Sequence, residues 1–154
     1  PGEKGEIVVR GYALMDGYLD DDEATSAAID HEGWLHTGDI GILDQNGYIK
    51  ITDRSKDMFI VGGFNAYPAE IENILCDHPA ISQAAVIGIA DERMGEVAKA
   101  FIVLKPNHEL QEDTLVEWSK ENMANYKVPR EIEFVEALPT NAAGKVMKFI
   151  LKEG

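Results

Sequence analysis

Two stretches in the first third of the chain alternate apolar and polar residues, as β-strands do when one face is buried. The first covers residues 6–10, and the second covers residues 34–53. Within the second stretch, Asn46-Gly47 separates two alternating segments. An Asn-Gly pair in this position is typical of a tight hairpin turn, which needs residues that tolerate a left-handed backbone. The pattern predicts a strand followed by a β-hairpin.

Beyond residue 53 the periodicity changes to a mixture of helices and strands. Pro68 suits the first turn of a helix, where its missing N–H would be unpaired in any case. Glu70 and Glu72 suit the positive end of the same helix dipole. Apolar runs of strand length and further helical patterns follow. The expected elements are a helix from Pro68, strands at 84–89 and 97–104, a helix at 111–123, a strand at 131–136 and a short helix at 146–152.

These elements predict two structural parts with a boundary near Asp53. Residues 53–154 are expected to form an α+β domain of about 100 residues, which is within the usual domain range. Residues 1–52 are too few and too strand-rich to bury their own faces, and open strand edges of that kind usually belong to a larger sheet. Because the chain opens directly into a strand, we expect residues 1–52 to be the β-rich terminal segment of a truncated larger domain.

The composition is that of a globular protein, since 45% of the 154 residues are hydrophobic and 27% are charged. The chain has 14 Lys and Arg against 28 Asp and Glu, so its formal net charge is -14. Such a surface repels nucleic-acid phosphates and anionic lipids. No apolar run reaches membrane-spanning length. We therefore expect no nucleic-acid partner and no transmembrane segment.

The chain has one cysteine, Cys76, which cannot form an internal disulfide. Because it lies in a segment with a helical pattern, we expect it to be a small buried hydrophobic residue. No signal peptide is evident. These features predict a reducing, cytoplasmic compartment.

Three polar clusters remain once the apolar faces are assigned. Asp39 lies in a glycine turn, where its carboxylate could accept hydrogen bonds from vicinal ribose hydroxyls or simply close the turn with its own backbone. Arg54 belongs to a charged run that is either a solvated linker or a ligand site followed by a hinge, with Gly62 and Gly63 allowing close backbone approach. Lys145 lies in a glycine-containing turn and, taken alone, is a solvated loop residue.

Several classes of active site have no support in the sequence. Around Lys145, Pro139 replaces the first glycine of the phosphate-binding loop G-x-x-x-x-G-K-S/T, and Val146 replaces its hydroxyl residue. The four histidines lack metal-binding spacing, so no metal site is expected. The G-x-S-x-G and G-x-G-x-x-G motifs are absent. Hydrolase, metalloenzyme and dehydrogenase functions are therefore disfavoured.

Four motifs follow one another along the chain: GEIVVRGYALMDGYL, GWLHTGD, ITDRSKDMFIVGGFNAYPAEIE and NYKVPREIEFVEALPTNAAGKVMK. Together they resemble the adenylate-forming superfamily, and within it the acyl-CoA synthetases, which ligate fatty or other carboxylic acids to coenzyme A (CoA). The resemblance covers essentially the whole chain. It implies that residues 1–52 end a large N-terminal adenylation domain, that residues 53–154 form the small mobile C-terminal domain, and that a hinge lies at residues 54–57.

The resemblance also implies a two-step ligase with domain alternation. A carboxylic acid and ATP, with Mg²⁺, would give an acyl-adenylate and pyrophosphate, and the thiol of CoA would then displace AMP. A cation between the two reacting anions needs no neighbouring base, because the carboxylate is already the nucleophile. By motif match, Asp39 would bind the ribose hydroxyls and Arg54 would contact the nucleotide. Lys56 would be the hinge residue, and Gly62 and Gly63 would line the path of the pantetheine thiol. Lys145 would be the mobile catalytic cation.

The sequence departs from the family in two respects. Lys148 stands where relatives often have arginine, which keeps the charge but not the fork geometry. The phosphate loop and the acyl pocket of the family would lie upstream of Pro1, so the chain alone is expected to be inactive and the pocket that selects the acid lies outside it. Two alternatives stay open: an adenylation enzyme that loads a carrier-protein thiol, and a non-catalytic regulatory or binding module.

Overall fold

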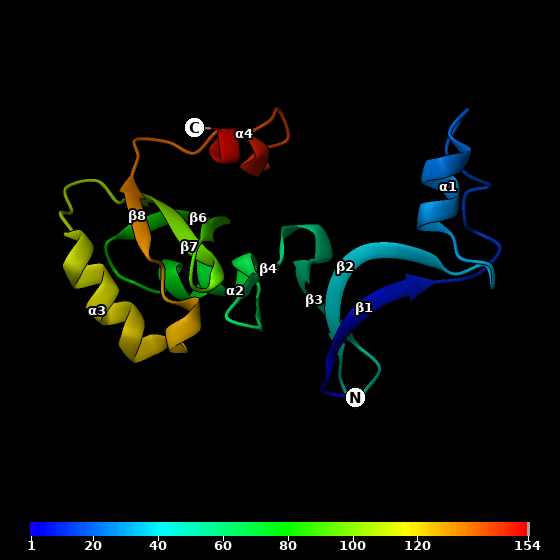
Figure 1. Ribbon diagram of the computed structural model, residues 1–154, viewed down its shortest axis with the longest axis horizontal. Helices are drawn as coiled ribbons and strands as arrows, with labels where there is room; N and C mark the ends of the chain where they lie inside the picture. Colours follow the sequence, from blue (N-terminus) through cyan, green and yellow to red (C-terminus); the bar gives the residue numbers. More distant parts are fainter. Residues whose placement is uncertain (154) are drawn as a thin grey trace. The chain divides into compact units, whose positions relative to one another are not determined.

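The computed structural model describes residues 1–153 (Figure 1). The chain divides into two compact units, Pro1–Lys56 and Asp57–Gly154, which we call the N-terminal unit and the C-terminal unit. The division falls within residues 54–57, where the hinge is predicted, but hinge motion itself stays a prediction. No helix among the described residues is long and apolar enough to cross a membrane.

The N-terminal unit is built on a three-stranded antiparallel sheet in the order β1-β2-β3. Its strands are β1 (Lys4–Val9), β2 (Leu35–Leu43) and β3 (Ile49–Arg54). Strands β2 and β3 form the predicted hairpin. The Asp44 N–H donates to the Tyr48 carbonyl at 2.9 Å, and Gly47 has a φ of +86°. The hairpin is therefore confirmed, with the glycine in the left-handed conformation that the turn requires.

One helix in this unit, α1 (Asp22–Ala28), was not predicted. Its signal in the sequence is confined to its start, where the Asp21 side chain accepts a hydrogen bond from the Ala24 N–H at 2.9 Å. Asp22 and Glu23 in the first turn also suit the helix dipole. No residue of α1 is buried. Because α1 has no core-facing side, its sequence lacks the apolar periodicity from which a helix is usually predicted.

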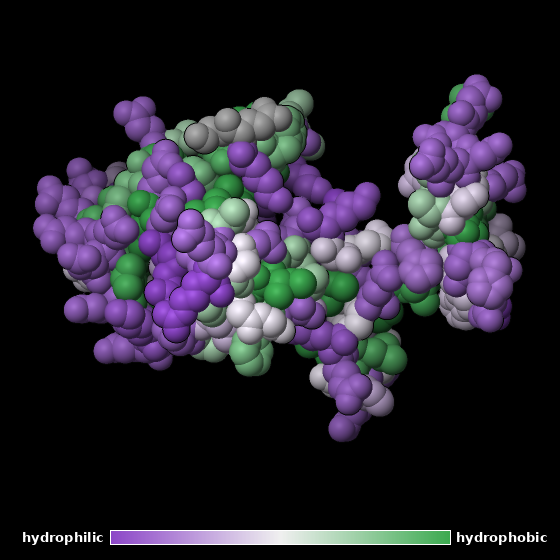
Figure 2. Space-filling view, viewed as in Figure 1, coloured by the Kyte–Doolittle hydropathy of each residue, from purple (hydrophilic) through white to green (hydrophobic). Residues whose placement is uncertain are grey.

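The sheet of the N-terminal unit buries little of its own apolar surface. Ile40 is the one buried hydrophobic side chain in the part of this unit that the structure describes, whereas Ile51 is 62% exposed and Leu19 is 92% exposed. Figure 2 shows such hydrophobic residues at the visible surface among predominantly hydrophilic ones. Large exposed apolar areas commonly mark contact with another protein surface. The assignment of these residues to a larger domain stays a prediction.

The C-terminal unit is α+β, as predicted, and its sheet has the order β5-β4-β7-β6, with β8 parallel to β7. The helices and strands predicted beyond Pro68 are all present, with ends shifted by only a few residues. The hairpin of β4 and β5 was not predicted. The elements are β4 (Phe59–Val61), β5 (Phe64–Ala66), α2 (Pro68–Cys76), β6 (Ile81–Asp91), β7 (Gly95–Leu104), α3 (Glu112–Asn122), the 3-10 turn η2 (Asn125–Lys127), β8 (Glu131–Phe134) and α4 (Lys148–Glu153).

Both faces of this sheet are covered, because alternate residues of β7 point to opposite sides. Ala98, Ala100 and Ile102 pack with apolar residues of α2 and α3 in the larger core. Phe101, between them in sequence, packs in a second core with Leu138 and with apolar residues of the final segment, Val146 and Leu151. The segment that carries Lys145 is therefore fastened to the face of the sheet opposite α2 and α3.

The prediction that Cys76 is buried is wrong. Cys76 is exposed at the end of α2, because Ile71 and Leu75 form the inward face of that helix. Neighbouring protein atoms shield part of the thiol from water, which raises its pKa, and the backbone of Ala84 partly opposes this effect. Cys76 therefore lies at the protein surface and does not fill the core.

Candidate functional site

The two residues predicted to contact the nucleotide lie opposite each other in the β2–β3 ladder. Asp39 is in register with Arg54, and Arg54 Nε donates to Asp39 Oδ1 at 3.1 Å. The Asp39 side chain is 31% exposed and that of Arg54 is 53% exposed. A guanidinium has five N–H donors and a carboxylate has about four acceptor sites, so both groups keep capacity for a ligand.

The prediction that Asp39 lies in a turn is wrong: Asp39 lies within strand β2, at a point where the pairing of β2 with β1 is irregular, and Thr37 ties this segment to β1. The Thr37 hydroxyl donates to the Ile7 carbonyl at 2.7 Å and accepts from the Asp39 N–H at 3.1 Å. Gly38 has a φ of +72°, a conformation that favours glycine. The backbone therefore presents Asp39 in one defined orientation.

Glu6 of β1 also holds this segment of β2 in place, and nothing in the sequence pointed to that contact. Glu6 Oε2 lies 2.8 Å from His36 Nδ1, and Oε1 accepts from the Gly38 N–H at 3.2 Å. Asp30 Oδ2 lies 3.6 Å from His36 Nε2. The hydrogen bond with Glu6 raises the pKa of His36, and partial burial opposes this. Because Glu6 and His36 are far apart in sequence, only the pairing of β1 with β2 reveals the contact.

Lys56 lies in the 3-10 turn η1 (Ser55–Asp57), at the last position of the N-terminal unit. Its side chain is exposed. Lys56 is thus where the chain passes from one unit to the other. Its role as the hinge residue stays a prediction.

Gly62 and Gly63 form the two-residue turn between β4 and β5. Their φ angles are +57° and +88°, as a tight hairpin turn requires. The Gly62 N–H donates to the Met94 carbonyl at 2.8 Å, and a Cβ on Gly62 would lie 2.6 Å from Met94 Cε. A Cβ on Gly63 would meet nothing within 4 Å. The turn is therefore packed on one side and open on the other.

An exposed aromatic pair follows this glycine turn. The rings of Phe64 and Tyr126 stack with centroids 5.1 Å apart and planes inclined by 24°. Phe64 is 60% exposed. Sequence reasoning missed this pair, because the two residues belong to different motifs and meet only when η2 packs against β5.

The turn that carries Lys145 is held by the side chain of Asn141. Asn141 Oδ1 accepts from the Ala143 N–H at 3.0 Å and from the Lys145 N–H at 2.9 Å. The Asn141 N–H donates to the Lys145 carbonyl at 2.9 Å, and Gly144 has a φ of +77°. The predicted glycine-containing turn is thus present and is held by hydrogen bonds.

The ammonium group of Lys145 is available for a ligand. The residue is exposed, and its side chain has no ion pair or hydrogen bond with any other residue in the range 1–153. By contrast, two lysines of the same unit are held in ion pairs, Lys99 with Glu133 at 3.0 Å and Lys127 with Glu70 at 2.6 Å. The described residues contain no group of three or more His, Cys, Asp or Glu arranged to hold a metal ion.

Comparison with protein families identifies the C-terminal unit. Residues 70–145 match the model of the AMP-binding enzyme C-terminal domain. Residues 70–145 therefore belong to this domain family. The matched segment begins in α2 and ends at Lys145, the residue predicted to be the catalytic cation.

Individual relatives extend the similarity to nearly the whole chain. The chain is 57% identical over 152 residues to a methyl-dioxo-octahydro-indenyl propanoyl:CoA ligase from Rhodococcus jostii. This alignment covers 99% of this chain and 30% of that protein. The chain is also 47% identical over 148 residues to a feruloyl-CoA synthase from an Amycolatopsis species, and this alignment covers 96% of this chain and 30% of that protein. The chain therefore spans about 30% of the length of the curated relatives that it matches.

Solved structures show the same likeness of fold. The ATP-bound MatB of Rhodopseudomonas palustris matches with a TM-score of 0.93 and 36% identity, over 99% of this chain and 30% of that chain. The o-succinylbenzoate CoA synthetase MenE of Bacillus subtilis, in complex with its acyl-adenylate intermediate, matches with a TM-score of 0.88 and 39% identity, over 100% and 31%. The fold resemblance noted in the sequence is thereby confirmed.

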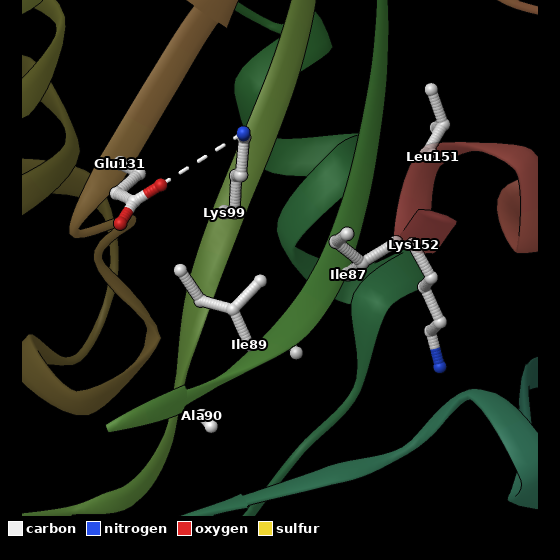
Figure 3. Close-up of a pocket in the computed structure, with 8 residues that line it drawn as sticks. Ile87, Ile89, Ala90, Lys99, Glu131, Leu151 and Lys152 are labelled. Carbon is white, nitrogen blue, oxygen red and sulfur yellow. Dashed lines mark ion pairs between the residues drawn. The ribbon is translucent and has the colours of Figure 1, made fainter. Parts of the chain in front are cut away.

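A groove of about 450 Å³ also lies on the C-terminal unit, and the predicted site residues are not among those that line it (Figure 3). Ile87 and Ile89 of β6 contribute its apolar part, and Leu151 of α4 lies on the other side. Lys99 and Glu131 form an ion pair of 3.9 Å within it. The groove forms where α4 covers only part of the sheet.

Proposed function

We propose that this chain supplies the C-terminal part of an AMP-forming ligase that activates a carboxylic acid with ATP and transfers the acyl group to the thiol of CoA. The observation that carries the proposal is Lys145, an exposed and unpaired cation on a hydrogen-bonded turn. The relatives named as a CoA ligase and a CoA synthase support the same reaction class. The residue roles below are part of the proposal.

In the first step, a carboxylate oxygen bonds to the α-phosphorus of ATP as the bond to pyrophosphate breaks. Two anions must approach each other, and the leaving pyrophosphate carries further negative charge. An ammonium group placed between them lowers the barrier electrostatically, and one such donor is worth roughly 3–4 kcal/mol in a water-poor site. Lys145 suits this role because no carboxylate among the described residues neutralises its Nζ.

Asp39 and Arg54 would hold the nucleotide for this step. The Asp39 carboxylate can accept hydrogen bonds from the ribose hydroxyls, and Arg54 can donate to the nucleotide with the N–H groups that do not face Asp39. Mg²⁺ would enter with the phosphates of ATP as part of the substrate, because it usually binds through substrate phosphates with few protein ligands.

In the second step, the thiol sulfur of CoA bonds to the acyl carbon and AMP leaves. Gly63 has open space where a side chain would be, so a narrow chain such as pantetheine could pass close to the backbone. The exposed Phe64–Tyr126 pair offers an apolar surface beside it. Lys145 would withdraw between the steps through motion about Lys56, which is the domain alternation inferred from the family resemblance.

A chimera tests this proposal. Residues 1–154 would replace the aligned segment of the Rhodococcus jostii ligase, to which they are 57% identical. We expect the chimera to release pyrophosphate with ATP and the acid named for that relative, and to form the thioester with CoA. The 154-residue chain alone serves as the negative control and is expected to do neither. A folded chimera that releases no pyrophosphate would contradict the proposal.

The same chimera distinguishes the acceptors. Supplied with CoA or with the phosphopantetheine thiol of a carrier protein, it is expected to form product with CoA. Faster transfer to the carrier protein would favour the carrier-loading alternative. Tight ATP binding by the 154-residue chain alone would favour the regulatory or binding module, since the ligase proposal predicts weak binding. A cytoplasmic location stays a prediction from the sequence.

A further inference from the structure

An ion pair joins the start of helix α4 to helix α2. Lys148 Nζ lies 2.7 Å from Glu72 Oε1, and the two side chains are 21% and 19% exposed. Such limited exposure reduces screening by water and makes the geometry more restrictive than in a surface pair. The two residues are far apart in sequence but fix the relative position of their two helices.

Glu72 is an anchored partner, because a second contact holds the same oxygen. Glu72 Oε1 accepts from the Val86 N–H of β6 at 2.7 Å. Helix α2 thus uses Glu72 to satisfy a backbone donor of β6, and the carboxylate stands at a fixed place for Lys148.

Lys148 follows directly on the base of the Lys145 turn. Thr140 and Val146 form an antiparallel bridge across this base, and the Met147 N–H donates to the Pro139 carbonyl at 2.8 Å. The paired residues that close the turn, Val146 and Met147, are therefore followed directly by Lys148, with no flexible linker between them. On the N-terminal side of the turn, the buried side chain of Leu138 anchors the chain.

We infer that Lys148 and Glu72 are positioning residues for Lys145. Their ion pair fixes the C-terminal end of the turn, so that Lys145 Nζ is held at a defined position relative to the rest of the C-terminal unit. This inference rests on the proposed function, since it assigns the pair a role in adenylation. Displacing a catalytic group by about 1 Å can cost on the order of 100-fold in rate. The pair acts through Lys145 and has no role in transfer to the thiol.

Two substitutions remove the ion pair while keeping the other contacts. Lys148→Met keeps the length of the side chain without its charge. Glu72→Gln removes the charge but keeps an oxygen that can accept from the Val86 N–H. Lys148→Arg retains the charge and is the rescue variant. Lys152→Met is the matched control, because Lys152 is an exposed lysine on the same helix without an ion pair in the range 1–153.

The experiment measures both half-reactions in the chimera, together with its melting temperature. We expect Lys148→Met and Glu72→Gln each to slow adenylation by about 10- to 100-fold. Thioester formation from pre-made acyl-adenylate is expected to be unchanged. Lys148→Arg should restore adenylation, Lys152→Met should resemble the unsubstituted chimera, and the double variant should be no slower than either single one, because both remove one interaction.

Unchanged adenylation in the two variants would overturn the inference and leave the proposed function intact. An equal loss of both half-reactions, with a lowered melting temperature, would assign the ion pair to stability alone and also overturn it. Failure of the proposed function is distinguishable from both, because the unsubstituted chimera would then form no acyl-adenylate. If Lys148→Met does not fold, Glu72→Gln decides the question, since it keeps the contact to β6.

Discussion

Arg54 contacts Asp39 across the β2–β3 ladder, with Nε 3.1 Å from Oδ1 at positions that are directly in register. Both side chains are partly exposed, and exposed ion pairs contribute only about 0.2–1 kcal/mol to stability. Stability alone therefore gives little reason for the pair. Its main consequence is that each side chain fixes the orientation of the other at the proposed nucleotide site.

Replacing Arg54 with alanine is expected to weaken ATP binding with little effect on folding. A hydrogen bond to a charged group contributes about 1.5–3 kcal/mol, so we expect the KM for ATP of the chimera to rise by roughly 10- to 150-fold. Lys50→Ala is the matched control, because Lys50 is an exposed cation on the same strand without an ion pair among the described residues. Equal ATP KM values for the two variants would exclude the proposed role of Arg54.

Asn141 is expected to matter because its side-chain oxygen holds the Lys145 turn through two backbone N–H groups. Asn141→Ala removes both contacts and should slow adenylation in the chimera more than thioester formation. Asn141→Asp keeps an acceptor at this place and should retain more of the adenylation rate than alanine does. Pyrophosphate release measured for the two variants checks this. If alanine proved as active as aspartate, the hydrogen bonds would not position Lys145.

The two turn glycines are expected to respond differently to alanine. A left-handed conformation costs a residue with a Cβ roughly 1–2 kcal/mol, and this applies to both Gly62 and Gly63. Gly62→Ala should cost only slightly more, because its Cβ would lie 2.6 Å from Met94 Cε, the end of a flexible side chain that can move aside. Urea unfolding of the 154-residue chain measures the difference, and adding Met94→Ala should remove most of the excess. Equal destabilisation at the two glycines would show that the Met94 contact adjusts without cost.

The His36 contacts predict a pH dependence of stability. The hydrogen bond with Glu6 raises the pKa of His36 above 6.5 in the folded chain. A raised folded pKa means that the protonated histidine stabilises the fold at pH values below the unfolded pKa, and that this contribution is lost as the pH rises through the folded pKa. An NMR titration of His36 is expected to give a pKa above 6.5, and Glu6→Gln should lower it. A His36 pKa at or below 6.5 would contradict the prediction.

Local signals in the sequence predicted most elements of the fold. Asn46-Gly47 identified the β2–β3 hairpin, and Pro68 identified the start of α2, because each acts on the backbone at its own position. The β4–β5 hairpin was missed because Gly62 and Gly63 were interpreted only as residues that allow a ligand close to the backbone. Two glycines between apolar runs also signal a tight hairpin turn, and their positive φ angles show that this is what they form.

Contacts between distant residues could not be predicted in the same way. Glu72 was expected only to complement the dipole of α2, whereas its carboxylate binds Lys148 and the Val86 N–H. Cys76 was expected to be buried, but the rotation of α2 that buries Leu75 leaves its neighbour exposed. Both outcomes depend on how α2 packs beside β6, which helical periodicity alone does not determine.

The most direct test of the proposed function is the adenylation rate of the chimera with Lys145→Ala. We expect the rate of pyrophosphate release to fall by roughly 100- to 1,000-fold, because the cation that stabilises the reacting anions is lost. Thioester formation from pre-made acyl-adenylate should proceed at the rate of the unsubstituted chimera. Equal loss of both half-reactions, or no loss of adenylation, would contradict the assignment of Lys145 as the cation that acts only in the first step.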